Sequence, residues 1–220
     1  MKTEGHISIR CLTVGDLATN CYIVSQGDQK SCVVIDPGAE GERIAAEIRD
    51  LKLIPQIILL THSHYDHIGG AEALQAVFPE AEVACHAECA SRAQNGRANF
   101  SFFLIGRAKP GPPIARLLRD GERIMVGDIS LAAWETPGHA PGHMIFSCEG
   151  AKSVFTGDLI FAGSIGRIDI PEADASLLAA SIRRLFAVFA PETTIWPGHG
   201  PNSTLATEAS TNSWVREIAG

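Results

Sequence analysis

The sequence predicts an α/β protein folded as a single domain over residues 1–220, and three observations support that prediction. Apolar runs of strand length alternate with segments of helical periodicity. The strand-rich segments form two blocks, each followed by a helix, which suits two stacked halves. The length is enough for a two-layer core, and no linker or break in composition divides the chain.

The first block contains five apolar segments that are expected to form strands: 7–14, 21–25, 31–35, 57–60 and 83–85. A helix is expected after the third strand, because Ile44, Ile48 and Leu51 recur at helical spacing. A second helix over 70–78 follows the fourth strand, and Pro79 closes it.

The segment 95–113 is the least regular part of the chain. It contains Phe100, Phe102 and Phe103, followed by three prolines among glycines. Long loops of this kind are often functional, so one interpretation is a flap over a site. The other interpretation is a loop whose phenylalanines simply pack on the core, and the sequence favours neither.

The second block contains five further segments that are expected to form strands: 123–126, 129–135, 144–147, 153–156 and 194–196. A long helix is expected to begin at Asp174, which suits an N-cap, and to end at Pro191. Its buried face is predicted from five apolar residues at helical spacing: Leu178, Ile182, Leu185, Phe186 and Phe189. The tail over 204–218 has a weaker helical pattern.

Composition argues against several classes of protein. The net charge of −7 disfavours a nucleic-acid-binding surface, which needs clustered lysine and arginine. The apolar fraction of 45% is typical of a soluble globular protein, and no apolar run is long enough to span a bilayer. The N-terminus shows no apolar signal region, and the six cysteines are scattered. We therefore expect a cytoplasmic protein with reduced, mostly buried thiols.

The chemistry is expected to centre on the stretch 61–67, Thr-His-Ser-His-Tyr-Asp-His, which follows an apolar strand. This clustering of histidines beside a carboxylate fits metal binding better than packing. At an extended strand end, His62 and His64 point to the same side. If the chain then turns helically, His64 and His67 lie about one turn apart. A polar loop whose histidines meet water is the competing interpretation, and it suits a lone histidine better than a cluster.

Three further candidate ligands repeat this arrangement. His139, Asp158 and His199 each come shortly after a strand of the second block, through a turn that contains glycine. Loops at the carboxyl ends of strands commonly carry functional groups in α/β layers. Turn glycines let the backbone approach a crowded centre. Each position alone is weak evidence, but four loops with the same pattern favour convergence on one metal centre.

Five histidines and two aspartates exceed the three or four protein ligands of one tetrahedral ion, so they suit two ions. The two proposed sets are His62, His64 and His139 for the first ion, and Asp66, His67 and His199 for the second. Asp158 is assigned as the bridge, because a carboxylate has two oxygens to share. Two ions about 3.5–4 Å apart lower the pKa of a shared water and polarise the scissile group.

The remaining histidines are expected to lie outside this set. His6 falls in a polar start and is expected to be solvated, and His86 is expected in a surface loop. His143 could support the site from behind, but a structural role at a strand start is favoured.

These residues, in this order, resemble the metallo-β-lactamase superfamily from about residue 12 to residue 212. The matching segments are Thr-His-Ser-His-Tyr-Asp-His at 61–67, Thr-Pro-Gly-His at 136–139, Phe-Thr-Gly-Asp at 155–158 and Pro-Gly-His-Gly at 197–200. Within the superfamily the chain looks like the short, single-domain bacterial form of glyoxalase II, with added support from 19–22, 35–38 and 157–167. The ligand set is specific for the fold and for a two-metal site, and less specific for substrate.

The resemblance implies an αββα sandwich, with two mixed β-sheets flanked by helices and the metals at one edge. It also implies a binuclear hydrolase that converts S-2-hydroxyacylglutathione, such as S-D-lactoylglutathione, to glutathione and a 2-hydroxy acid. A metal-bridging hydroxide would attack the thioester carbonyl, the metals would hold the oxyanion, and Asp66 could orient the nucleophile. Two divalent ions per chain are expected, with zinc first and iron or manganese also compatible. The expected partner is a small-molecule thioester, for a monomer or homodimer that binds neither nucleic acid nor membrane.

Two features set the sequence apart from full-length glyoxalase II enzymes. Those enzymes carry a C-terminal helical domain that helps to hold glutathione, whereas this sequence ends about twenty residues after His199. They also place a basic residue and then a tyrosine after the bridging aspartate. Here Arg167 matches the basic residue, but Asp169 stands in the tyrosine's place. Arg167 is expected to bind a glycyl carboxylate of the substrate, with a surface salt bridge as the alternative. A thioester other than one of glutathione is therefore an alternative substrate.

Other functions fit the sequence less well. A persulfide dioxygenase of the same fold uses one iron held by two histidines and an aspartate, so the complete second set argues against it. A ribonuclease of the superfamily is disfavoured by the acidic balance and by the absence of an RNA-binding insert. A β-lactamase usually replaces the second metal's Asp-His pattern or bridges with cysteine. A non-catalytic binding module would normally have lost ligands, and none is missing.

Overall fold

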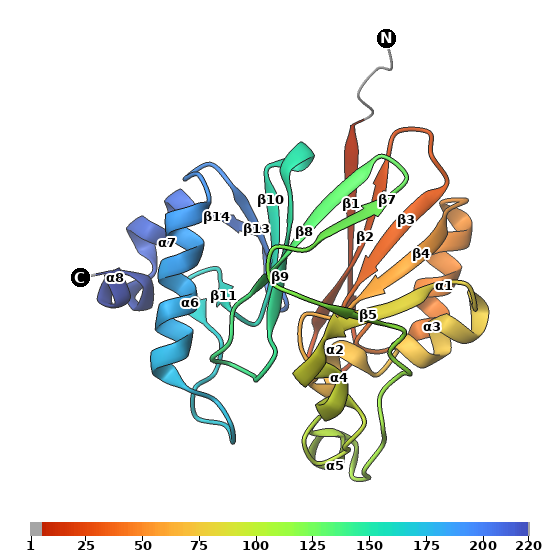
Figure 1. Cartoon of the computed structure of the whole chain (residues 1–220), viewed down its shortest axis with the longest axis horizontal. Helices are drawn as coiled ribbons and strands as arrows, with labels where there is room; N and C mark the ends of the chain where they lie inside the picture. The colour runs from red at the N-terminus through yellow and green to blue at the C-terminus, as the bar shows by residue number, and fades with distance from the viewer. Residues whose placement is uncertain (1–5, 220) are drawn as a thin grey trace.

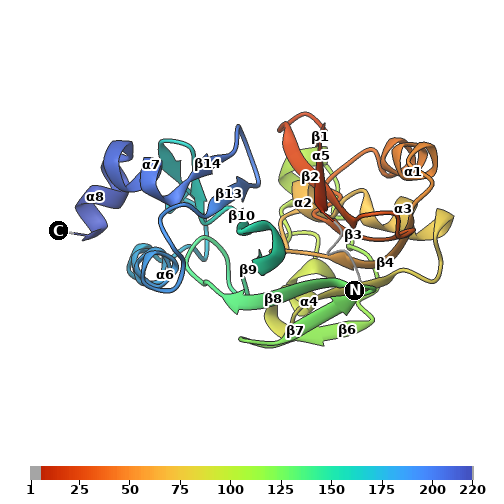
Figure 2. The ribbon, with the colours of Figure 1, turned by 90° about the horizontal axis from the view of Figure 1, so that it is seen from above.

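The computed structural model describes residues 6–219, which form four layers: helices, a six-stranded sheet, a second six-stranded sheet and helices again (Figure 1). Seen from above, the two sheets face each other and helices lie on both outer sides (Figure 2). This arrangement confirms the αββα sandwich with two mixed sheets. The six cysteines, all within the described residues, are free thiols, and five of them are buried. Across 6–219, no helix is long and apolar enough to cross a membrane.

The first sheet comes from the N-terminal half of the chain. Its strands, in order across the sheet, are β1 (Ile7–Val14), β2 (Thr19–Gln26), β3 (Ser31–Ile35), β4 (Ile54–Leu59), β5 (Glu82–His86) and β6 (Arg116–Leu118). The first three are antiparallel neighbours, whereas β3 to β6 run parallel. β4 begins three residues before the predicted strand and includes Pro55. The three residues of β6 are too few to show a periodicity, so the sequence pattern predicts no strand there.

Five helices belong to this half: α1 (Gly41–Asp50), α2 (Tyr65–Ile68), α3 (Ala71–Val77), α4 (Ala87–Ala93) and α5 (Ser101–Ile105). α1 and α3 cover the outer face of the first sheet, where Ile44 and Ile48 belong to one buried cluster with Val34 and Ile58. The prediction that Leu51 continues this stripe is wrong. α1 ends one residue earlier, and Leu51 is 41% exposed.

The second sheet comes from the C-terminal half. Its strands, in order across the sheet, are β14 (Ser203–Thr204), β13 (Thr194–Pro197), β10 (Ser153–Gly157), β9 (Met144–Cys148), β8 (Ile129–Glu135) and β7 (Arg123–Val126). Only β10 and β13 are parallel neighbours. A separate small hairpin is formed by β11 (Ile160–Phe161) and β12 (Ser164–Ile165).

Three helices cover the outer face of the second sheet: α6 (Ala175–Val188), α7 (Leu205–Thr211) and α8 (Ser213–Ala219). Asp174 caps α6 as predicted, because its side chain accepts a 2.9 Å hydrogen bond from the backbone nitrogen three residues later. The first three residues of the predicted stripe on α6 are buried. Phe186 and Phe189 are half-buried at its margin, and Phe189 lies just past the end of the helix.

The central core lies between the two sheets. Side chains alternate along β3, so that Val33 and Ile35 face the second sheet while Cys32 and Val34 face the helices. From the opposite sheet, Phe155 is fully buried against this layer. Because both faces of each sheet are covered, these strands are apolar at nearly every position, which is the pattern seen in the sequence.

Strand direction places the functional loops at one end of the sandwich. β8 and β10 are both antiparallel to β9, and β13 is parallel to β10, so these three strands end at the same edge. β4 of the first sheet ends beside them, at the lower end in Figure 1. The four loops that carry the candidate ligands therefore meet at this end.

Candidate metal centre

The seven candidate ligands lie together at this end, although four separate loops supply them. Their donor atoms form three overlapping groups, each within 4.8 Å: His62, His64 and His139; His62, His67 and Asp158; and Asp66, His67 and His199. The first is called the His139 group below, and the last the His199 group. These two groups correspond to the two ligand sets proposed from the sequence, and the middle group joins them.

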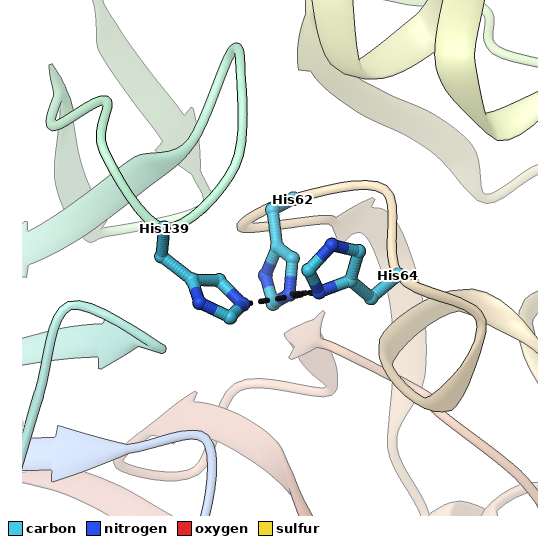
Figure 3. Close-up of side chains that lie close together, drawn as sticks. All are labelled: His62, His64 and His139. Atoms are coloured by element: carbon cyan, nitrogen blue, oxygen red, sulfur yellow. Dashed lines mark hydrogen bonds between the residues drawn. The ribbon is translucent and has the colours of Figure 1, made fainter. Parts of the chain in front are cut away.

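Three imidazole nitrogens meet at the centre of the His139 group (Figure 3). His64 Nδ1 lies 3.0 Å from Nε2 of His62 and 3.0 Å from Nε2 of His139. His139 Nδ1 donates to the Arg167 carbonyl, so its Nε2 carries a lone pair. His62 Nδ1 donates to Thr61 Oγ1, whose own proton goes to a buried carboxylate, so His62 Nε2 also carries a lone pair. One proton on His64 can satisfy only one of these two nitrogens.

Electron-rich atoms also face each other in the His199 group. His67 Nδ1 lies 2.9 Å from Asp36 Oδ2, and His199 Nδ1 lies 3.1 Å from the Leu17 carbonyl. Because these oxygens can only accept, each Nδ1 carries a proton, and each ring presents a lone pair on Nε2 once it is neutral. The two Nε2 atoms are 3.3 Å apart, and Asp66 Oδ2 lies 3.6 Å and 3.4 Å from them. A cation between these atoms would relieve their repulsion.

The carboxylate of Asp158 lies between the two groups. Its Oδ1 is 3.3 Å from His67 Nε2, and its Oδ2 is 3.6 Å from both His139 Nε2 and His199 Nε2. Oδ1 is buried and receives no hydrogen bond from any described residue. A buried carboxylate oxygen without a donor is costly unless a cation compensates it. The position and the orphaned oxygen of Asp158 both suit a bridge between two ions.

The electrostatics of the two groups differ. Burial lowers the pKa of His62, His64 and His139, so these rings are neutral near pH 7. Burial acts in the same direction on His67 and His199, but adjoining carboxylates outweigh it and raise the pKa of both rings. Burial likewise opposes the charge on the two site aspartates, yet the facing histidines hold their pKa below the usual range. Both aspartates are therefore anions, as metal ligands must be.

Asp36 organises both groups from behind. Its Oδ1 accepts the backbone N–H of Thr61 at 2.7 Å, and its Oδ2 accepts from Thr61 Oγ1 at 2.6 Å and from His67 Nδ1 at 2.9 Å. Asp36 therefore fixes the ring of His67 directly and that of His62 through Thr61. Reasoning from residue spacing missed this role, because Asp36 lies 25 positions before Thr61. The one sequence feature that points to Asp36 is the Ile-Asp-Pro-Gly segment at 35–38, which supports the family resemblance.

His143 supports the bridging loop. It is fully buried, its Nδ1 bonds Thr136 Oγ1 at 2.9 Å, and its Nε2 accepts the backbone N–H of Asp158 at 3.2 Å. Burial lowers the pKa of His143 to about 3, so the ring stays neutral and can accept that bond. It also stands directly before β9, so the expected position at a strand start and the contact with the site both hold.

The loop that carries His199 is held by β2. The Asn20 side chain donates to the carbonyls of Pro197 and Gly200, and the Tyr22 hydroxyl donates to the Pro197 carbonyl at 2.6 Å. Thr19 Oγ1 donates to Asp66 Oδ2 at 3.2 Å. This strand of the first sheet therefore ties the last ligand loop of the second sheet to the metal centre.

Gly198 shows why glycine stands next to a ligand. A Cβ at this position would lie 2.3 Å from Asp158 Oδ1 and 2.6 Å from His67 Cε1. Any side chain there would push the Asp158 carboxylate away from the His199 group. The expected close approach of backbone to a crowded centre is thus present at Gly198.

A cavity of about 560 Å³ opens over the ligands. Thirteen residues line it: Leu17, His64, Asp66, Phe100, Phe103, Leu104, His139, Asp158, Phe161, Arg167, Ile170, Pro171 and His199. The flap interpretation of 95–113 is therefore correct for Phe100 and Phe103, and the Phe100 ring lies 4.7 Å from that of His64. Phe102 does not line the cavity and packs under Arg97 instead.

Arg167 lines the cavity but does not point freely into it. Its guanidinium bonds both oxygens of Asp169, at 2.9 Å and 3.0 Å, and the Arg167 side chain is 69% exposed. The surface ion pair weighed as the alternative is therefore present, although the position still borders the site. The Arg167 carbonyl has a second task, because it fixes the ring of His139.

The other two histidines lie away from the ligands. His6 is exposed, as expected. The expectation for His86 is wrong: it caps α4 and its Nε2 lies 2.9 Å from Glu135 Oε1, so it joins the two halves of the sandwich. No local pattern could indicate this, because the partner lies on a strand of the other sheet.

Two stacked mixed sheets with a cluster of histidines and carboxylates at one edge define a class of metal-dependent hydrolases. The chain belongs to the metallo-beta-lactamase superfamily, whose family model matches residues 14–199.

Similar proteins share nearly the full length. The Haemophilus influenzae protein "Hydroxyacylglutathione hydrolase GloC" is 31% identical over 217 residues, covering 95% of this chain and 98% of its own. The crystal structure of the BLEG-1 B3 metallo-beta-lactamase matches with a TM-score of 0.89 at 31% identity, covering 94% of this chain and 99% of that one. TTHA1623, solved in a di-iron-bound form, matches with a TM-score of 0.82 at 39% identity, covering 93% and 99%.

Proposed function

We propose that this metal-dependent hydrolase is a binuclear thioesterase of the glyoxalase II type, which hydrolyses S-2-hydroxyacylglutathione. The observation that carries the proposal is the position of Asp158, whose carboxylate lies between two complete groups of ligands. A two-ion site of this kind suits hydrolysis of an activated acyl group. The name of the Haemophilus influenzae relative supports a hydroxyacylglutathione substrate.

The residues present suit two divalent ions. The His139 group would hold one ion, the His199 group the other, and Asp158 both. When bound, such ions supply Lewis-acid chemistry: they polarise a carbonyl and lower the pKa of water. We propose zinc as the natural metal. Iron is the competing metal, because one similar structure is a di-iron form and histidine and carboxylate suit both.

Asp66 is proposed as the residue that orients the attacking water. It borders the cavity and its side chain is 16% exposed, so it can reach solvent as well as the ligands. Thr19 Oγ1 donates to its Oδ2, which fixes the carboxylate. The low pKa of Asp66 keeps it an anion, so it can accept a hydrogen bond from water at neutral pH.

The test is hydrolysis of S-D-lactoylglutathione, with metal analysis on the same purified sample. We expect thiol release that depends on about two ions per chain and that stops after chelation. Full metal loading without hydrolysis of any thioester would overturn the proposal. Oxygen uptake with glutathione persulfide, together with one iron per chain, would instead assign a persulfide dioxygenase.

A further inference from the structure

The cavity over the metal centre continues as a groove along α5. A second cavity of about 310 Å³ adjoins the first, and the two share Leu17, Asp66 and Leu104 as lining residues. One continuous groove therefore leads from the ligand Asp66, between the turn after β1 and the end of α5, as far as Ile105. A lactoyl group is small and would fill only the part of this groove next to the metals.

The groove is lined by exposed apolar side chains. Leu17 is 49% exposed, Phe103 66%, Leu104 42% and Ile105 43%. Phe103, Leu104 and Ile105 are consecutive in α5, and Leu17 lines both cavities together with Leu104, so the four side chains form one patch. Contiguous exposed apolar surface next to a functional site commonly marks a ligand groove.

Charge divides the site into two ends. Among the described residues that line either cavity, Arg167 is the only lysine or arginine, and it lies beside His139. The opposite end lies beside His199, where the Leu17 carbonyl holds that ring. Beyond Leu17 the charged lining residues are acidic, Asp16 and Glu40. Glu40 is paired with Arg43 at 2.6 Å, which leaves Asp16 to repel the carboxylates of glutathione, and no lysine or arginine is among the described residues lining this end to bind them. An uncharged chain would not be repelled there.

We propose that the acyl arm of the substrate is an extended apolar chain that lies in the groove between Leu17 and Leu104. The thiol arm then lies toward Arg167. This inference rests on the proposed thioesterase function and extends its substrates from 2-hydroxyacyl groups to thioesters of longer, apolar acids. In the reaction, water supplies oxygen to the acyl carbon as the carbon–sulfur bond breaks. The products are a carboxylate, a thiol and one proton.

The first experiment varies only the acyl chain. Acetyl-, butanoyl-, hexanoyl- and octanoyl-glutathione are compared by kcat/KM with S-D-lactoylglutathione. We expect kcat/KM to rise at least tenfold from acetyl to hexanoyl. Non-hydrolysable S-(2-oxoalkyl)glutathiones of the same lengths should show the same trend in Kd by calorimetry, which measures the groove without turnover.

A pair of variants tests the position of the chain. Leu104→Ser should reduce the hexanoyl-to-acetyl ratio of kcat/KM at least fivefold. Phe102→Ser is the matched control: Phe102 lies on the same helix and is 39% exposed, but it lines neither cavity. It should keep the wild-type ratio. Equal loss in both variants would overturn the assignment of Leu104, because it would show a general effect on α5.

The outcomes separate this inference from the proposed function. A flat dependence on acyl length, with rapid hydrolysis of S-D-lactoylglutathione, overturns the apolar arm and leaves the thioesterase standing. Tighter binding of longer analogues without hydrolysis of any thioester supports the groove and overturns the thioesterase. A gain that appears only when the apolar chain is placed on the thiol, as in benzyl thioesters against N-acetylcysteamine thioesters, overturns the assignment of the two arms.

Discussion

The His139 group and the His199 group lie side by side and are both rich in histidine, yet only the second contains a carboxylate, and the two differ in charge. The His139 group holds three histidines, and burial keeps their pKa low. The His199 group includes Asp66, and its two histidines face carboxylates that raise their pKa. The difference shows that a shared motif does not imply equal sites. The first is preset to receive a cation, and the second must first release protons.

Substitution of Asp158 tests whether the two groups share one carboxylate. Asp158→Ala should lower kcat by about 10³-fold or more, because it removes the carboxylate that lies between the two groups. Bound metal should fall as well, which we would measure by elemental analysis of the purified variant. Asp28→Asn, at an exposed carboxylate in the turn between β2 and β3, serves as the control for expression and handling. Wild-type turnover with unchanged metal would rule out a bridging role.

Removing one histidine from each group tests whether the groups are separate. His199→Ala should lower the metal content by about one ion per chain and leave the other ion bound. His139→Ala should do the converse, and both should lower kcat by about 10²-fold or more, since both ions contribute to the chemistry. Metal analysis after exhaustive dialysis gives the stoichiometry. If either variant loses both ions, the two groups behave as one cooperative site.

Asp36→Asn tests the support behind the ligands. The amide oxygen introduced by this substitution could still accept one hydrogen bond, but the charge that holds His67 Nδ1–H would be lost. Loss of such a supporting carboxylate typically costs about 10–100-fold in metal affinity. We expect the larger loss at the His199 group, which Asp36 contacts directly, and a smaller one at the His139 group. Competition with a chromophoric chelator measures both, with Asp50→Asn at the exposed end of α1 as the control.

The pH dependence of metal binding should also differ between the two groups, with the His199 group the more sensitive to acid. Protons compete with metal at His67 and His199 at higher pH, because the pKa of both rings is raised. They compete at His64 and His139 only at lower pH, because the pKa of these rings is lowered. As pH falls from about 8, the ion of the His199 group should therefore leave first. Metal content after equilibration between about pH 8 and pH 5 checks this, and simultaneous loss of both ions would contradict it.

Much of the site is predictable from sequence because each ligand has a local signature. An apolar strand, one or more small turn residues and then a histidine or aspartate recur four times, and strands that run in the same direction bring their ends to one edge. The histidine stretch follows the same logic, because His64 stands at the N-cap position of the short helix α2 and His67 lies within it. The sequence around each candidate ligand is therefore enough to predict it.

The remaining features depend on contacts between distant positions. Asp36 reaches Thr61 and His67, and His86 reaches Glu135 across the two sheets. No spacing rule connects such residues, because only the packed sheets bring them together. The short helix α5 is not predictable either, because the residue before it, Phe100, has a positive φ of 62° that no sequence pattern indicates.

The smallest expected effect lies at the rim, where Arg167 borders the His139 group. If Arg167 binds the thiol arm of the substrate, Arg167→Ala should raise KM for glutathione thioesters about two- to fivefold and leave kcat nearly unchanged. The effect is small because the guanidinium is exposed and already bonds Asp169. The substitution keeps the backbone carbonyl that holds His139, so the metal group stays intact. Asp169→Asn should act in the opposite direction, because it frees the guanidinium for a substrate carboxylate. A neutral N-acetylcysteamine thioester should respond to neither change. An equal response of the glutathione and N-acetylcysteamine thioesters would assign Arg167 to structure alone.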